Sequence, residues 1–144
     1  MEIKKILIID DDKIVLESMT KLFIRDNWNV DICQNGQEGL EKVKNSQYDC
    51  ILCDVRMPGF TGTQVLSKIR ELEEKKLIDK QHVIFMTGYA DEDAPIEAFR
   101  LGAYQYIHKP FDIKDVLEKA NACATSQKVL QTFSEISEEA LSKD

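Results

Sequence analysis

The sequence predicts an α/β protein with a doubly wound, five-stranded parallel sheet. Short apolar runs recur at residues 6–9, 30–33, 50–53, 83–86 and 104–107, the second and fifth being weaker than the others. Continuously apolar runs, rather than alternating ones, are typical of strands that are covered on both faces. Segments with helical periodicity separate the runs, and this repeated strand–helix order predicts parallel strands joined by right-handed crossovers.

Five helices are expected, one after each strand. Apolar residues with helical spacing mark four of them: Val15, Met19, Leu22 and Phe23; Leu40 and Val43; Val65, Leu66, Ile69 and Leu72; Val116, Leu117 and Ala120. Asp12 and Asp112 suit the N-caps of the first and fifth helices. Pro95 fits the first turn of the fourth helix, which is expected to end near Gly102. The third helix is expected to break up in the charged segment 73–76.

Length and composition narrow the class of protein. The 144 residues suit one domain, and 43% hydrophobic with 31% charged residues is an ordinary globular balance. The net charge of −7 disfavours direct nucleic-acid binding, because duplex binders neutralise phosphates with Lys and Arg. No apolar run approaches the roughly 20 residues that cross a bilayer. The N-terminus leaves no room for a signal peptide, so a cytoplasmic location is expected.

The cysteines at positions 50 and 53 form a CxxC motif, which raises the question of a zinc or redox site. Residues three apart on a strand point to opposite faces of the sheet, so these two thiols could not share a metal. No second CxxC or CxxH completes a zinc set. We therefore expect the cysteines to be small buried apolar residues.

Polar residues follow the predicted strands where each one ends. They are Asp10, Asp11 and Asp12 after the first, Asp54 after the third, Thr87 after the fourth, and Lys109 after the fifth. The carboxyl ends of parallel strands lie at one edge of the sheet, so the carboxylates converge there if the first and third strands are neighbours. Ligands of open α/β sheets bind at this edge. Clustered carboxylates repel one another unless a cation such as Mg²⁺, which prefers oxygen ligands, lies between them. This set suits phosphoryl transfer, with one Asp attacking phosphorus beside a Lys.

The motifs that carry this chemistry resemble those of a known family. They read IIDDD at 8–12, LCDVRMPG at 52–59, MTG at 86–88 and YIHKPF at 106–111. The chain is similar to the receiver domains of two-component response regulators, the chemotaxis-regulator-like family. The resemblance spans about residues 3–124 and implies a flavodoxin-like (βα)5 receiver fold. It divides the chain into a receiver domain over residues 1–124 and a C-terminal helical extension, or start of a linker, over residues 125–144.

The resemblance also implies a role for each matched residue. Asp54 matches the phosphoacceptor, Asp11 a direct Mg²⁺ ligand, and Asp10 a ligand that acts largely through water. The backbone carbonyl of Arg56 would complete the protein's share of the Mg²⁺ shell. Other matches are Thr87, whose hydroxyl turns to bond the phosphoryl group; Lys109, the lysine that pairs with it; and Tyr106, whose rotamer follows the Thr. Asp12 is expected to be a helix N-cap rather than a ligand.

The function that the resemblance implies is a phosphorylation switch. A sensor histidine kinase, a phosphotransfer protein or a small phosphodonor would phosphorylate Asp54 with Mg²⁺. Thr87 would then move inward and Tyr106 would fill the vacated space, which remodels the face made by the fourth helix, fifth strand and fifth helix. That face would control a partner or output domain. Such a protein assists its own phosphorylation and dephosphorylation only, so it is not expected to be an enzyme.

Two alternative functions would leave different motifs in the sequence, and two residues bear on the lifetime of the phosphoryl group. A haloacid-dehalogenase-type phosphatase would carry its nucleophile in a DxD motif on the first strand. A degenerate receiver that acts as a phosphate-independent interaction module would lack one of the acids or the lysine. Arg56 and Tyr89 lie two residues beyond the acceptor and the Thr, where the family admits hydrolytic water. If they crowd that path rather than face solvent, self-dephosphorylation is slow.

The C-terminal segment carries a second pattern. Val129, Phe133, Ile136 and Ala140 are spaced four, three and four residues apart, as in the seam of a coiled coil. The pattern covers about two heptads only. It fits a helix that continues the fifth one and pairs in a homodimer, the start of a linker to an output domain, or a frayed tail that folds back.

Overall fold

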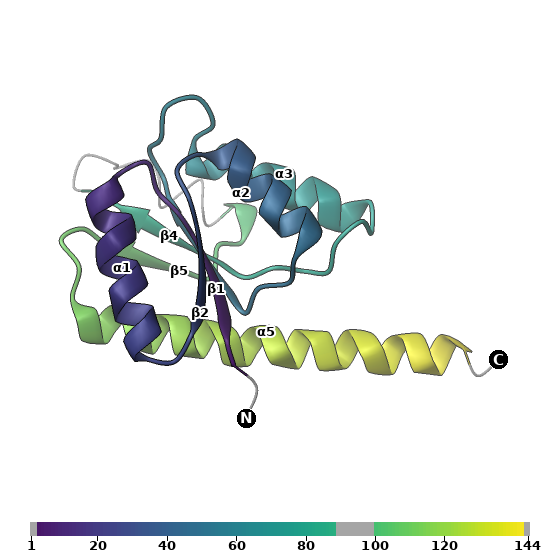
Figure 1. Ribbon diagram of the computed structural model, residues 1–144. Helices are drawn as coiled ribbons and strands as arrows, with labels where there is room; N and C mark the ends of the chain where they lie inside the picture. The colour runs from purple at the N-terminus through teal and green to yellow at the C-terminus, as the bar shows by residue number, and fades with distance from the viewer. Residues whose placement is uncertain (1–2, 89–99, 143–144) are drawn as a thin grey trace.

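The computed structural model describes residues 3–88 and 100–142, which form a parallel sheet between two layers of helices (Figure 1). The strands are β1 Lys5–Ile9, β2 Asn29–Cys33, β3 Cys50–Asp54, β4 Val83–Thr87 and β5 Gln105–His108. All neighbouring strands are parallel, in the order β2-β1-β3-β4-β5. The predicted fold class is therefore confirmed, and β1 lies beside β3 as convergence of the carboxylates requires.

The described helices cover the two faces of the sheet. They are α1 Lys13–Arg25, α2 Gly36–Asn45, α3 Gly62–Glu74 and α5 Ile113–Ser142. Figure 1 shows α1 and α5 on one face and α2 and α3 on the other. Each pair of helices packs its apolar residues into a separate core cluster, because the buried strand residues alternate between the two faces. Both faces of β3 are buried, which accounts for its continuously apolar sequence.

The helix boundaries follow the residues that predicted them. The Asp12 side chain accepts a hydrogen bond from the Ile14 amide at 2.9 Å, and Asp112 accepts one from the Lys114 amide at 3.0 Å. The N-cap roles of both residues are thus confirmed. Helix α3 ends at Glu74, inside the predicted charged segment.

The fourth helix was predicted to begin near Pro95, which lies outside the described residues. Arg100 and Leu101 are helical, and Gly102 follows with φ +73°. Glycine is favoured in this left-handed conformation at the end of a helix. The predicted end of the fourth helix near Gly102 is therefore confirmed.

The four cysteines are buried and free. Cys50 packs in the cluster under α1 and α5, whereas Cys53 packs in the cluster under α2 and α3. Their side chains therefore point to opposite faces of β3, as expected from strand geometry, and the CxxC motif is not a shared metal site.

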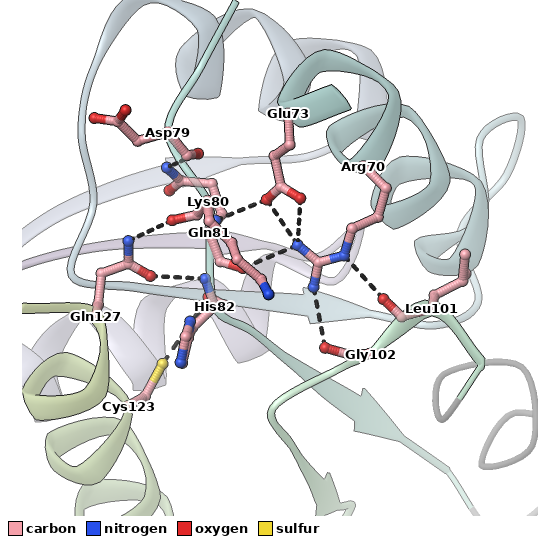
Figure 2. Close-up of polar contacts among 10 residues, drawn as sticks. All are labelled: Arg70, Glu73, Asp79, Lys80, Gln81, His82, Leu101, Gly102, Cys123 and Gln127. Carbon is pink, nitrogen blue, oxygen red and sulfur yellow. Dashed lines mark hydrogen bonds and ion pairs between the residues drawn. The ribbon is translucent and has the colours of Figure 1, made fainter. Parts of the chain in front are cut away.

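Polar contacts anchor α3 and α5 to the edge of the sheet opposite the acidic residues (Figure 2). The Arg70 guanidinium on α3 donates to the Leu101 and Gly102 carbonyls at 2.9 and 3.0 Å, and pairs with Glu73 at 2.7 Å. The Gln127 side chain on α5 accepts a hydrogen bond from the His82 amide at 2.9 Å and donates one to the Lys80 carbonyl. Both partners lie in the loop before β4. Gln127 is 1% exposed, so its two hydrogen bonds are shielded from water.

Helix α5 continues past Gln127 to Ser142 and projects beyond the sheet (Figure 1). Val129, Phe133 and Ile136 on this projecting part are 50%, 65% and 57% exposed. The C-terminal segment is therefore a continuation of the fifth helix and does not fold back on the domain. No helix within the described residues is long and apolar enough to cross a membrane.

Candidate functional site

The predicted site residues come together at the carboxyl edge of the sheet. Asp10 follows the last residue of β1, Asp54 ends β3, Thr87 ends β4, and Lys109 follows β5. Because these four strands are parallel and adjacent, their ends lie at the same edge. Ligands of doubly wound sheets bind at this edge.

Three carboxylates form the centre of the site. Oxygen atoms of Asp10, Asp11 and Asp54 all lie within 4.8 Å of one another. Asp10 is fully buried and Asp54 is 6% exposed, whereas Asp11 faces solvent. The Asp10 carboxylate also accepts a hydrogen bond of 2.9 Å from the Asp12 amide, which fixes its orientation. Such an all-oxygen set, buried on one side and open to water on the other, fits a hard divalent cation such as Mg²⁺.

Lys109 places one cation between two of these acids. Its ammonium nitrogen lies 3.2 Å from Asp10 Oδ2 and 3.4 Å from Asp54 Oδ1. Burial alone would lower the pKa of Lys109, but the Asp54 and Asp10 carboxylates outweigh burial and raise the pKa above its usual value. Lys109 is therefore a cation at neutral pH.

One lysine does not compensate the whole acidic cluster. The pKa of Asp54 is raised from 3.8 to about 6, mainly by burial and then by the Asp10 carboxylate, while Lys109 opposes both effects. Burial also raises the pKa of Asp10, against the hydrogen bond from the Asp12 amide and the charge of Lys109. Ionised carboxylates are thus held at a free-energy cost, which a divalent cation would relieve.

The two switch candidates lie on one side of β4 and β5. Thr87 is 2% exposed, and its Oγ1 lies 3.2 Å from Nδ1 of the exposed His108. The Tyr106 ring is partly buried and its centroid lies 6.4 Å from that of Phe85. Thr87 thus has a hydrogen-bond partner that the sequence motifs did not single out. The register of β4 and β5, which pairs Thr87 with His108, is the signal that could have found it.

Gly62 is a second residue that the motifs missed. A Cβ atom there would lie 2.4 Å from the Asp54 carbonyl oxygen and 2.9 Å from the Cα atom of Val55. The Gly62 amide donates to the Val55 carbonyl at 2.8 Å. Only glycine allows α3 to begin this close to the acceptor strand.

Two further predicted residues concern the loops at this edge. Arg56 lies two residues beyond β3, and it is exposed. Tyr89, which was predicted to border the path of hydrolytic water, lies outside the described residues. The roles of both residues remain predictions.

Comparison with known proteins agrees with this geometry. Residues 6–121 match the family model of the response regulator receiver domain. Regulatory protein AtoC of Escherichia coli K12 is 32% identical over 114 residues, which are 79% of this chain and 24% of AtoC. Response regulator ArlR of Staphylococcus aureus is 30% identical over 123 residues, which are 85% of this chain and 53% of ArlR.

A solved structure extends the agreement to three dimensions. The CheY-like receiver domain protein from Methanospirillum hungatei has a TM-score of 0.79 and 31% identity, over 88% of this chain and 98% of that one. The chain spans about a quarter of AtoC and about half of ArlR. The family match covers most of the chain and includes every residue of the acidic site. This chain therefore belongs to the family of response regulator receiver domains.

Proposed function

We propose that this receiver domain is a phosphorylation switch in which Asp54 accepts the phosphoryl group. The observation that carries the proposal is the setting of the Asp54 carboxylate. It lies within 4.8 Å of two other carboxylates and 3.4 Å from the Lys109 ammonium, at the edge of the sheet where ligands bind. The donor would be a sensor histidine kinase, a phosphotransfer protein or a small phosphodonor.

The proposed reaction forms an acyl phosphate. An oxygen of the Asp54 carboxylate attacks the phosphorus of a phosphorylated imidazole, the new O–P bond forms, and the N–P bond breaks with its electron pair left on nitrogen. Lys109 would pair with the transferred phosphoryl oxygens, and the contact of its ammonium with Asp54 supports this role. The protein would assist this reaction and the later hydrolysis of its own acyl phosphate, without turning over a separate substrate.

Mg²⁺ is the metal that fits the donor set. Asp10, Asp11, Asp54 and the backbone carbonyl of Arg56 would hold it. When bound, the ion would neutralise charge on the phosphoryl oxygens. The raised pKa of Asp54 supports this part of the proposal, because a bound cation favours the ionised form that attacks phosphorus.

Thr87 and Tyr106 would report the modification. A phosphoryl group adds a charge of about −1.5 to −2 at pH 7. Moving an equilibrium from 1:99 to 99:1 requires about 5.5 kcal/mol of differential interaction, so some contacts must form only in the active state. We propose that the Thr87 hydroxyl moves to the phosphoryl group and that Tyr106 turns inward. The face of the fourth helix, β5 and α5 would then control an output domain or downstream protein.

The projecting part of α5 would carry the signal out of the domain. Its apolar residues Val129, Phe133 and Ile136 are exposed, and Gln127 anchors the helix immediately before them. We propose that a second copy of the chain pairs along these residues, or that the helix leads into an output domain. The relatives AtoC and ArlR are longer than this chain, which is consistent with either arrangement.

Neither alternative function has comparable support. The phosphatase alternative places the nucleophile on the first strand, whereas Asp54 lies at the end of β3 and the family match is to receiver domains. The phosphate-independent module would lack an acid or the lysine, yet Lys109 contacts both Asp10 and Asp54.

Binding of beryllofluoride, a mimic of the phosphoryl group, tests the proposal. Calorimetry in the presence of Mg²⁺ should show one site in the parent protein, and none in Asp54→Asn. Asp79→Asn, which neutralises an exposed acid far from the site, should bind like the parent. If Mg²⁺ binds but beryllofluoride does not, the interaction-module alternative is favoured.

A further inference from the structure

The hydrogen bond between Thr87 and His108 is a contact that the proposed switch has to break. The two residues are paired in the register of β4 and β5, so their side chains lie next to each other on the same face of the sheet. Thr87 Oγ1 and His108 Nδ1 are 3.2 Å apart. Thr87 is 2% exposed, whereas His108 is exposed, so the contact joins a buried hydroxyl to a side chain at the surface.

The chemistry of the two groups makes their contact compete with phosphoryl binding. A hydroxyl carries a single hydrogen. When His108 is protonated on Nε2 only, Thr87 donates that hydrogen to Nδ1. A phosphoryl oxygen accepts and cannot donate, so it requires the same hydrogen. In the other neutral tautomer, Nδ1 donates to the hydroxyl oxygen and leaves the hydroxyl hydrogen free, so the contact then opposes phosphoryl binding only by holding the Thr87 side chain in its present rotamer.

Loss of the His108 ring would leave the backbone of this region intact. The Lys109 amide donates to the Thr87 carbonyl at 2.8 Å, a bond that joins β5 to β4 without any side chain. His108 is exposed and belongs to neither apolar core cluster. The effect of its ring on Thr87 is therefore separable from the stability of the sheet.

We propose that His108 is a positioning residue that holds the Thr87 hydroxyl in its unphosphorylated orientation and so opposes activation. The inference rests on the proposed function, because it assigns His108 a role in the same switch. Phosphorylation then has to replace the His108 contact of Thr87 with a phosphoryl contact. Removing the imidazole favours the active state before any phosphoryl group is present.

Beryllofluoride binding in the presence of Mg²⁺ tests this role. His108→Leu should bind the mimic about three- to tenfold more tightly than the parent, the range expected for loss of one competing hydrogen bond. His108→Asn retains a polar group near the position of Nδ1 and should restore affinity to within about twofold of the parent. In a Thr87→Ala background, His108→Leu should leave affinity unchanged, because the hydroxyl that His108 holds is gone.

A second measurement follows Thr87 directly. Three-bond NMR couplings in the unphosphorylated protein should report one Thr87 side-chain rotamer in the parent and in His108→Asn, and rotamer averaging in His108→Leu. Unchanged or weaker binding by His108→Leu would overturn the inference, and so would tighter binding that persists in the Thr87→Ala background. If the parent itself fails to bind beryllofluoride, the proposed function fails, which is a different result from failure of the His108 effect alone.

Discussion

The Lys109 ammonium lies 3.4 Å from Asp54 Oδ1, although Lys109 follows β5 and Asp54 ends β3, two strands away in the sheet. The same ammonium lies 3.2 Å from Asp10. One ammonium thus links the carboxyl ends of β1, β3 and β5 by charge. The charge of Lys109 does not balance three carboxylates, and the excess negative charge has consequences for stability, for metal binding and for the proposed phosphorylation.

Asp54→Asn should raise the stability of the metal-free protein at pH 7. The pKa of Asp54 is about 6 in the folded state and about 3.9 when unfolded, so the folded state binds more protons between these values. The free energy of unfolding therefore falls as pH rises from about 4 to about 6. At pH 7 the ionisation of Asp54 lowers the free energy of unfolding by at most about 3 kcal/mol, because one pKa unit corresponds to about 1.4 kcal/mol.

Thermal unfolding in EDTA at pH 4 to 7.5 would measure this effect. The melting temperature of Asp54→Asn relative to the parent should increase with pH up to about 6 and then level off. Asp79→Asn, an exposed control, should show no such trend. A difference that is independent of pH, or a less stable Asp54→Asn at pH 7, would contradict the prediction.

Mg²⁺ affinity should fall as pH falls through the pKa of Asp54. A protonated carboxyl group is a poor ligand, so protons compete with the metal. With a pKa of about 6, affinity at pH 5 should be about tenfold lower than at pH 7. Calorimetric titration at the two pH values measures this change. An affinity that is equal at both would show that Asp54 is not a ligand.

Gly62→Ala should destabilise the protein by about 1–3 kcal/mol, the usual cost of forcing extra volume into a packed region. The added Cβ would lie 2.4 Å from the Asp54 carbonyl oxygen, so α3 or the end of β3 must move. Gly88→Ala is the control, because among the described residues nothing lies within 4 Å of a Cβ at that position. Urea unfolding compares the two, and equal stabilities would contradict the close approach at Gly62.

Gln127→Leu should loosen the attachment of α5 to the loop before β4. The change removes the acceptor of the His82 amide, which is 2.9 Å away, and leaves a sheltered donor without its partner. The expected loss is about 1–3 kcal/mol. Hydrogen exchange of the His82 amide should speed up, whereas Ser134→Ala on the exposed part of α5 should leave it unchanged. Exchange that is equally slow in Gln127→Leu would count against the anchoring role.

Phe133→Glu should prevent pairing of two chains along the projecting part of α5, if that pairing occurs. Phe133 is 65% exposed at the centre of the apolar residues there, and a charge at a buried seam is unfavourable. Ser134→Glu adds the same charge at an adjacent exposed position and should not affect pairing. Sedimentation equilibrium measures the masses. A monomeric parent protein at high concentration would rule out the homodimer and favour the linker.

The fold and the acidic cluster were predictable from the sequence because each depends on a local pattern. Continuous apolar runs mark buried strands, and Asp10 and Asp54 stand directly at the ends of two of them. The order of the strands then places the acids together. Asp12 could be identified as an N-cap because capping involves residues only two positions away.

Contacts between distant backbone segments were not predictable in this way. A glycine is needed at position 62 because α3 begins against the Asp54 carbonyl. The presence of a glycine in the sequence does not show which backbone segment lies against it. Gln127 bonds backbone groups 45 and 47 residues away. His108 lies within the motif at 106–111, but the motif assigns it no role. Only the register of β4 and β5 places it beside Thr87.

Intact mass after incubation with acetyl phosphate and Mg²⁺ tests most directly whether Asp54 is a phosphoacceptor. The parent protein and Asp79→Asn should each gain one base-labile phosphoryl group, and Asp54→Asn should gain none. Phosphorylation of Asp54→Asn to the same extent would place the acceptor elsewhere. An unmodified parent, under conditions where Mg²⁺ binds, would contradict the phosphorylation switch.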